Sequence, residues 1–234
     1  MRRIPLLLLI LLAGTTLPLA AQIRGANGMK KGSWKPQDVP QGWKVYNIGR
    51  YEFQSDAPAD RVQRIGQHLN VMFRTYKKMF PTGRTPTGRF VIKIFKDRDG
   101  FREYGAPAGA GAYYSWTDKE MVGYDTGLLG GEMDPNRSAG KTGEKTNSVL
   151  ELLRKKRTMD TLGAFTHEGW HQYFHWYCTS KVDFPAWCDE GIAEYFYPTE
   201  LDEKGKPILG HPNTYRLDTI KAYIKREKHI PLEQ

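Results

Sequence analysis

The feature that most constrains this chain is the pentapeptide HEGWH, residues 167–171. It lies within a run, 161–178, whose pattern predicts a single helix. On a helix, His167 and His171 project from one face about a turn apart, close enough to bind one metal ion. Glu168 borders the same position and could hold a water molecule that the metal activates. Because a five-residue match can arise by chance, the pentapeptide alone also fits two ordinary core histidines.

A second acidic segment, WCDEGIAEY (187–195), follows the histidines. Eighteen residues separate His171 from Glu190 in this segment. Prolines flank it, and proline suits a first helical turn but cannot continue a helix, so a helix is predicted over 185–197. Glu190 and Glu194 then share one face of that helix. Two imidazoles and one carboxylate are a ligand set of catalytic zinc sites, in which a fourth position stays open.

The two segments together resemble the gluzincin superfamily of zinc metallopeptidases, in particular its exported bacterial peptidase-like domains. The resemblance rests on HExxH, eighteen residues, and then Glu in the pattern E-G-x-A-E-Y, and it covers about 161–197. It implies one Zn²⁺ per chain, bound by His167, His171 and Glu190. It also implies that Glu168 is the general base, which takes a proton from the activated water and passes it to the leaving amine. Glu194 would orient a ligand histidine; the alternative is an ordinary surface or salt-bridging residue.

The group that stabilises the developing oxyanion is not identified by these motifs. In the superfamily a tyrosine or histidine beyond the third ligand has this role, and the candidates here are His211, Tyr215 and Tyr223. His175 is expected to pack or to face solvent. The chain departs from the superfamily in two ways. It lacks the G-x-M-E-N stretch of aminopeptidases, and it ends soon after the zinc helices, where relatives continue into a helical subdomain.

The expected function is therefore that of an exported zinc-dependent endopeptidase acting on peptide or protein substrates. One alternative is a catalytically inactive, zinc-retaining binding module of the cell envelope. Another is a helical interaction protein in which the motif is fortuitous. The presence of Glu168 favours the enzyme over the binding module, because a pseudoenzyme tends to lose its base.

The amino end has the order of a secretory signal peptide over residues 1–21. Arg2 and Arg3 precede an apolar run over 4–12, and small residues at Ala20 and Ala21 suit cleavage. An uncleaved anchor is the rival interpretation, but the run is short and interrupted for a bilayer span. We expect a secreted or periplasmic protein of the cell envelope, without stable membrane insertion after cleavage. Residues 22–43 are then predicted to be a flexible leader, and 44–234 the peptidase domain.

The net charge of the chain does not identify a partner. The formal charge of +9 becomes +7 when Arg2 and Arg3 are removed. Apart from short clusters such as 154–157, the basic residues are scattered, and no nucleic-acid-binding module is present in the sequence. A solvated basic face is the simplest interpretation, so we expect no nucleic-acid partner.

The sequence contains two cysteines, Cys178 and Cys188. In an exported protein such a pair can form a disulfide, which here would join the end of the histidine helix to the segment bearing Glu190. Two free thiols are the alternative, and metal ligation is a third. The pair lies beside a site that already has its ligands, which disfavours metal ligation.

The remaining elements predict an α+β domain, with a small mixed sheet packed against helices. Asp160 or Thr158 could cap the histidine helix, and Gly169 within it could leave room at the site. The other predicted elements are a strand over 44–54, a helix over 59–80, a strand over 89–95, a short helix over 97–104, a hairpin of 112–116 with 120–124, a loop over 125–147 and a basic helix over 148–157.

Overall fold

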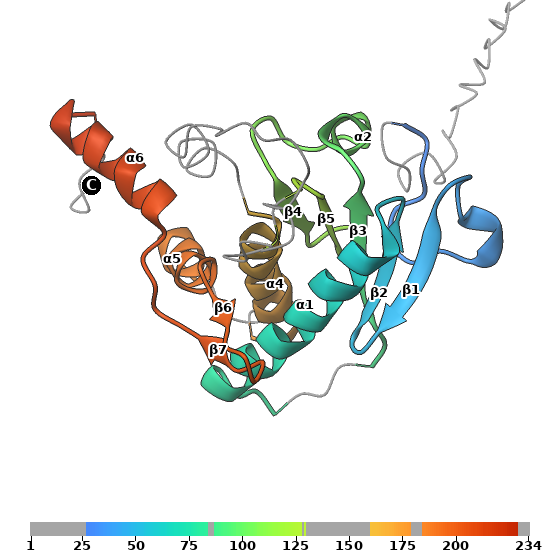
Figure 1. The fold of residues 1–234 in the computed structure, drawn as a ribbon, viewed down its shortest axis with the longest axis horizontal. Coiled ribbons are helices and arrows are strands. Elements are labelled where there is room, and N and C mark those ends of the chain that lie inside the picture. Colours follow the sequence, from blue (N-terminus) through green and yellow to red (C-terminus); the bar gives the residue numbers. More distant parts are fainter. Residues whose placement is uncertain (1–26, 84–86, 128, 130–159, 179–183, 229–234) are drawn as a thin grey trace, which may run out of the picture.

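The computed structural model describes residues 27–83, 87–127, 129, 160–178 and 184–228. Its architecture is α+β, as predicted: a five-stranded mixed sheet with the strand order β1-β2-β3-β5-β4, packed against helices. Helices α1 and α4 lie against the sheet, α5 lies beyond α4, and α6 projects from the body (Figure 1). The predicted signal peptide and the predicted basic helix lie outside the described residues.

The sheet combines two antiparallel hairpins with a parallel centre. Its strands are β1 (Lys44–Ile48), β2 (Tyr51–Ser55), β3 (Phe90–Phe95), β4 (Ala112–Ser115) and β5 (Glu120–Tyr124). Strand β3 pairs in parallel with β2 and β5, while β1 and β4 pair antiparallel at the two edges. The single strand predicted over 44–54 is wrong, because the chain turns at Gly49, where φ is +60°. The Asn70 side chain holds this turn by accepting from the Arg50 N–H at 3.0 Å.

Helix α1 (Ala59–Met79) is the crossover between the parallel strands β2 and β3, as a parallel connection requires. Its predicted bounds are confirmed to within one residue. The apolar residues spaced three or four apart form its buried face, namely Val62, Ile65, Leu69, Met72, Phe73 and Tyr76. These side chains belong to the main core, between α1, α4 and one face of the sheet.

Helix α4 (Thr161–Tyr177) packs on both α1 and the sheet. Asp160 caps it, accepting from Leu162 N at 3.3 Å and from Gly163 N at 2.9 Å, as predicted. A Cβ on Gly169 would lie 3.4 Å from the Tyr76 hydroxyl, so this glycine makes room for the helix packing and not for the functional site. The predicted second helix is α5 (Ala186–Phe196), with Pro185 as its N-cap.

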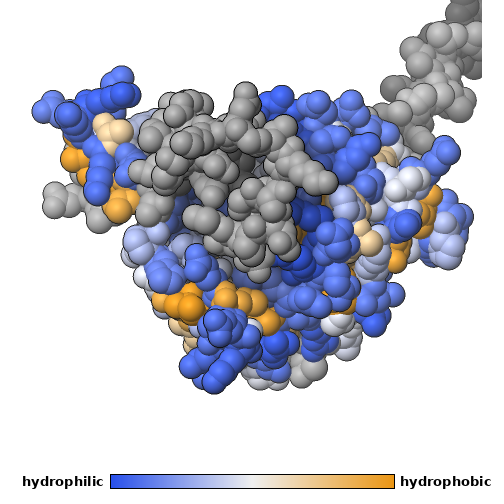
Figure 2. All heavy atoms as spheres, viewed as in Figure 1, coloured by the Kyte–Doolittle hydropathy of each residue, from blue (hydrophilic) through white to orange (hydrophobic). Residues whose placement is uncertain are grey.

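The smaller elements complete the described chain. They are a 3-10 helix (Pro36–Asp38), α2 (Arg98–Glu103), a two-stranded ladder of β6 (Glu200–Leu201) with β7 (Pro207–Ile208), and α6 (Thr214–Lys225). In Figure 2 hydrophobic and hydrophilic residues lie side by side on the projecting α6. Among the described residues, no helix combines the length and the apolar character that crossing a bilayer needs.

The predicted flexible leader is ordered over its described part, 27–43, which packs on the face of the sheet opposite α1. Trp34 is only 7% exposed, and its ring lies 5.4 Å from that of Trp43. The Gly32 N–H donates to Glu120 at 2.7 Å, and Lys31 pairs with Asp118 at 2.8 Å. The composition of this segment gave no sign of these contacts, because the partners lie far along the chain.

Candidate metal centre

Three side chains from two adjacent helices converge on one point. His167 and His171 come from α4, and Glu190 comes from the first half of α5. The two Nε2 atoms are 3.2 Å apart, the Glu190 Oε2 lies 3.2 Å from His167 Nε2, and the Glu190 Oε1 lies 3.6 Å from His171 Nε2. The group could therefore hold a metal ion, as the sequence spacing predicted.

The donor set fits a tetrahedral metal in both spacing and chemistry. With metal–ligand bonds of about 2.0–2.1 Å, two ligand atoms of a regular tetrahedron lie about 3.3 Å apart. The separation of the two histidine Nε2 atoms, 3.2 Å, is close to that edge length, and each of them has one oxygen of Glu190 within 3.6 Å, Oε2 for His167 and Oε1 for His171. Two imidazole nitrogens that face each other at such a distance need a proton or a cation between them. A hydrogen bond from His167 also lowers the pKa of Glu190, which keeps this ligand anionic.

Asp189 orients the second histidine. Its Oδ2 lies 2.9 Å from His171 Nδ1, and its Oδ1 accepts from the Trp170 indole N–H at 2.8 Å. Burial alone would lower the pKa of His171, but the hydrogen bond with Asp189 and the neighbouring carboxylates raise it overall. With Nδ1–H donating to Asp189, the lone pair of Nε2 is directed at the common point. We did not predict Asp189, although its position immediately before Glu190 in the acidic segment was a usable signal.

Glu194 lies beside the first histidine, one turn after Glu190. Its Oε1 is 3.4 Å from His167 Nδ1, a long contact compared with the one between Asp189 and His171. Two side chains from the segment around the start of α6 fix this carboxylate: Asn213 Nδ2 donates at 2.8 Å and Arg216 Nε at 3.2 Å. The geometry is compatible with orientation of His167, and it also gives Glu194 the ion pair that was the alternative.

Glu168 lies next to the three potential metal ligands but does not belong to that group. Its Oε2 accepts from the backbone N–H of Tyr114, on the edge strand β4, at 2.9 Å. Burial raises the pKa of the Glu168 carboxyl, and the nearby His167 and His171 oppose that rise. This carboxyl is therefore held in place by the sheet, with a pKa closer to neutrality than that of an ordinary glutamate. A carboxyl in such a position can act as a general acid or base.

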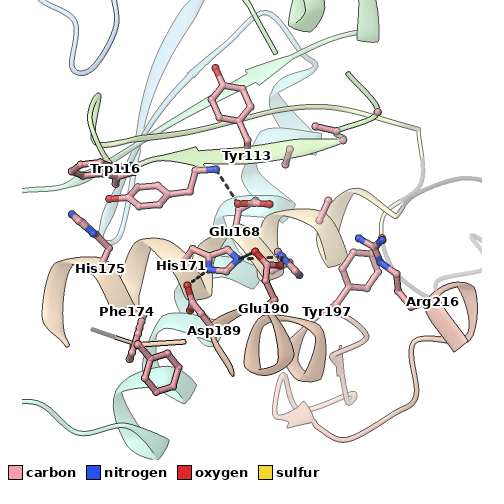
Figure 3. Close-up of a pocket in the computed structure, with 18 residues that line it drawn as sticks. Tyr113, Trp116, Glu168, His171, Phe174, His175, Asp189, Glu190, Tyr197 and Arg216 are labelled. Carbon is pink, nitrogen blue, oxygen red and sulfur yellow. Dashed lines mark hydrogen bonds and ion pairs between the residues drawn. The ribbon is translucent and has the colours of Figure 1, made fainter. Parts of the chain in front are cut away.

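The three potential ligands, Glu168 and Asp189 line a pocket of about 880 Å³ between β4, α4, α5 and the start of α6 (Figure 3). Glu168, His171, Asp189 and Glu190 lie at its middle in the close-up view. Trp116, Phe174 and His175 lie toward one end, and Tyr197 and Arg216 toward the other. The pocket opens to solvent at the metal site itself, because the Glu190 side chain is 62% exposed whereas His167 and His171 are 11% and 14% exposed.

None of the three oxyanion-donor candidates named from the sequence is among the described residues that line the pocket. His211 and Tyr223 are exposed and are not among the described residues that line the pocket, and the Tyr215 side chain lies outside the described structure. Tyr197 and Arg216 line the pocket instead. Burial, reinforced by Asp160, raises the pKa of Tyr197, so its hydroxyl stays protonated and can donate. No spacing rule along the chain would select these two residues.

Cys178 and Cys188 are both half-buried thiols, so the expected disulfide is not formed in this structure. Cys178 ends α4 and packs against the main core, while Cys188 lies in the first turn of α5. The alternative of two thiols describes the pair, and neither belongs to the described metal-ligand group.

The sequence matches no known protein family and no curated protein. What the fold and the site define is a class: an α+β protein with a potential metal centre of two histidines and one glutamate, shared between two helices. A second carboxylate, Glu168, lies beside that centre in an open pocket. Any narrower function has to be argued from this geometry.

Proposed function

We propose that this protein is a zinc-dependent metallopeptidase of the gluzincin type that hydrolyses internal peptide bonds. The observation that carries the proposal is the placement of Glu168. It is a carboxylate outside the ligand set, held by the Tyr114 N–H within the pocket that also contains His167, His171 and Glu190. A site that only stored or structurally used a metal would need neither a spare carboxylate nor an open pocket.

Zinc is the metal that this donor set suits best. Two imidazoles and one carboxylate leave a net positive charge on Zn²⁺ and one open position. His167, His171 and Glu190 would hold the ion. When bound, zinc polarises the peptide carbonyl and lowers the pKa of water from about 15.7 to about 7.

Glu168 moves the proton in the proposed reaction. The Tyr114 N–H engages its Oε2, which leaves Oε1 to take a proton from the water that attacks the peptide carbonyl carbon. The carbon–nitrogen bond then breaks, and the proton held by Glu168 passes to the departing amine nitrogen. The raised pKa of Glu168 supports both transfers, because a carboxyl that keeps a proton briefly near neutral pH can act as base and then as acid.

Tyr197 and Arg216 are the groups available to stabilise the negative charge that develops on the carbonyl oxygen. Both line the pocket, one as a protonated hydroxyl and the other as a cation. Gly163 makes room for this tyrosine, because a Cβ there would lie 2.7 Å from Cε1 of Tyr197. The assignment replaces the candidates taken from the sequence.

The substrate that we propose is a peptide or protein chain, met in the periplasm or outside the cell after cleavage of the signal peptide. The absence of the aminopeptidase stretch from the sequence supports action on internal bonds. The alternative function, a zinc-retaining binding module without activity, has less support because the base is retained and is positioned by the sheet.

The test uses the chain without its signal peptide. We expect about one zinc per chain, chelator-sensitive cleavage of peptides, and a loss of about 10²-fold or more in cleavage rate on Glu168→Gln with zinc content unchanged. Glu203→Gln, an exposed glutamate in the turn between β6 and β7, is the matched control and should cleave normally. A wild-type protein that contains no zinc would refute the proposal. Wild type that binds zinc but cleaves no member of a broad peptide library would favour the binding module.

A further inference from the structure

One end of the pocket is walled by aromatic side chains from three separate segments. Trp116 comes from the turn between β4 and β5, Phe174 and His175 come from α4, and Phe184 lies shortly before α5. The Trp116 ring lies 5.8 Å from the His175 ring, and the Phe174 ring lies 4.9 Å from the Phe184 ring. Figure 3 shows Trp116, His175 and Phe174 on the same side of the carboxylates Glu168 and Glu190.

Trp116 is the most informative member of this wall. It is 66% exposed, and a single exposed hydrophobic residue would need no explanation. Its setting differs from that of an isolated surface residue, because its ring meets His175 at the mouth of the pocket that contains the proposed base. Burial and the nearby Lys119 lower the pKa of His175, so this imidazole adds a neutral ring to the wall and not a charge.

The rest of the pocket differs in character. The loop before β4 and the first residue of β4 contribute small residues, Gly109, Ala110, Gly111 and Ala112, and Tyr113 and Tyr114 of β4 follow them in the lining. The opposite end carries Tyr197 and Arg216, and Arg216 Nε donates to Glu194. A bound chain would therefore meet indole and phenyl rings at one end and a tyrosine with a guanidinium group at the other. That asymmetry can select a side chain and also fix the direction in which a peptide lies.

The aromatic wall lies at a distance from the proposed base that suits a neighbouring substrate residue. Glu168 is fixed to Tyr114, and Trp116 follows Tyr114 by two residues. At about 3.4 Å per residue of extended chain, two residues span about 7 Å. A peptide whose scissile bond lies at Glu168 would then place a side chain within about two residues of that bond against the wall.

We propose that the pocket selects peptides with a large aromatic or aliphatic side chain within about two residues of the scissile bond, bound against Trp116 and His175. This selection rests on the proposed peptidase function for its effect on cleavage. As a binding preference it stands apart from the chemistry, because the wall does not include Glu168 or the metal ligands. Shape and apolar contact supply the selection, and a small or acidic side chain gains neither.

The test compares fluorogenic peptides that differ at one position, with Phe, Leu, Ala or Glu there. We expect kcat/KM for the Phe and Leu peptides to exceed that for the Ala peptide by at least about tenfold. Trp116→Ala should remove most of this preference, and Trp116→Phe should restore much of it. Trp187→Ala is the matched control, since Trp187 is 73% exposed but is not among the described pocket residues.

A second readout separates this inference from the peptidase proposal. The Glu168→Gln protein should bind the Phe peptide at least about tenfold more tightly than the Ala peptide, as measured by fluorescence anisotropy without turnover. Equal kcat/KM for all four peptides, or equal losses on all of them in Trp116→Ala, would overturn the aromatic selection and leave the peptidase standing. Tight binding of the Phe peptide without any cleavage by wild type would refute the peptidase and support the selection.

Discussion

Glu120→Gln is the substitution that should destabilise this fold most informatively. Glu120, at the start of β5, is fully buried and pairs with Lys93 of β3, which is also fully buried. Its carboxylate also accepts from the Tyr104 hydroxyl at 2.6 Å and from the Gly32 N–H at 2.7 Å. Lys93 donates in turn to the Gly32 carbonyl at 3.1 Å and lies 5.2 Å from the centre of the Trp34 ring.

The size of the expected loss in unfolding free energy follows from the lysine charge and the hydrogen-bond donors that Glu120→Gln leaves without a full partner. Breaking a buried ion pair by removing one partner typically costs about 3–5 kcal/mol, because the remaining charge stays buried without compensation. The amide has one acceptor oxygen, so it also cannot satisfy all three donors that meet Glu120. We therefore expect Glu120→Gln to lower the free energy of unfolding by about 3–5 kcal/mol.

Urea unfolding followed by circular dichroism measures this loss, and Glu52→Gln is its matched control. Glu52 is a half-buried glutamate that accepts from Ser33 Oγ at 2.7 Å and from the Trp34 N–H at 3.3 Å, so it holds the same segment without a buried ion pair. Its loss should amount to about 1–2 kcal/mol. Equal losses in the two variants, or less than about 1 kcal/mol for Glu120→Gln, would refute the reasoning.

The pH dependence of the Glu120→Gln variant gives an independent check. Burial lowers the pKa of Lys93, and Glu120 opposes that shift. Without Glu120 the folded-state pKa should fall further below the unfolded value. A lysine with a depressed folded pKa gains stability as the pH rises toward the unfolded value of about 10.4. The variant should therefore recover part of its lost stability between neutral pH and pH 10, where wild type recovers less.

Two further variants test a buried histidine and the metal site. His68 is buried against Thr166, and burial lowers its pKa to about 4, so its stabilising contribution is complete above about pH 6.5 and is lost as the pH falls toward 4. Between pH 6.5 and 4.5, His68→Gln should lose about 2–3 kcal/mol less than wild type in urea unfolding, whereas the exposed His211→Gln should follow wild type. Asp189→Asn removes the anionic partner of His171 Nδ1 and should weaken zinc binding by about 10–100-fold in a chelator competition, with the exposed Asp218→Asn unchanged; equal affinities would contradict the orienting role.

Local sequence signals were sufficient wherever an element is determined by its own periodicity and caps. Helix α1 has an unbroken apolar face, and α4 has Asp160 at its start, so both were predicted within about a residue. The first hairpin was missed because the residues on both sides of Gly49 are compatible with one continuous strand. What decides the turn is the positive φ of Gly49 and the Asn70 side chain from α1. That contact joins residues 20 positions apart, and no local pattern contains it.

In the candidate site, too, the residues placed by local spacing were predicted, and those placed by the packing of separate elements were not. His167, Glu168 and His171 lie on one helix, whose spacing fixes their relative positions. Glu190 lies on another helix, and its meeting with the histidines was expected from the resemblance to the gluzincin pattern. Arg216, Tyr197 and Trp116 reach the pocket through the packing of separate elements, which spacing along the chain does not determine.

The β4–β5 hairpin connects the ordered amino-terminal segment to the proposed base. On one side, Lys31 pairs with Asp118 in the turn of this hairpin, and the Gly32 N–H donates to Glu120, the first residue of β5. Ser115 of β4 pairs in register with Glu120, and the preceding residue of β4 donates its N–H to Glu168. The position of the proposed base is therefore fixed partly by residues that lie 88 positions before Glu120, in a segment whose composition is that of a linker. The buried ion pair of Lys93 with Glu120, bonded on both sides to the Gly32 backbone, thus ties this segment to the strand that pairs with β4.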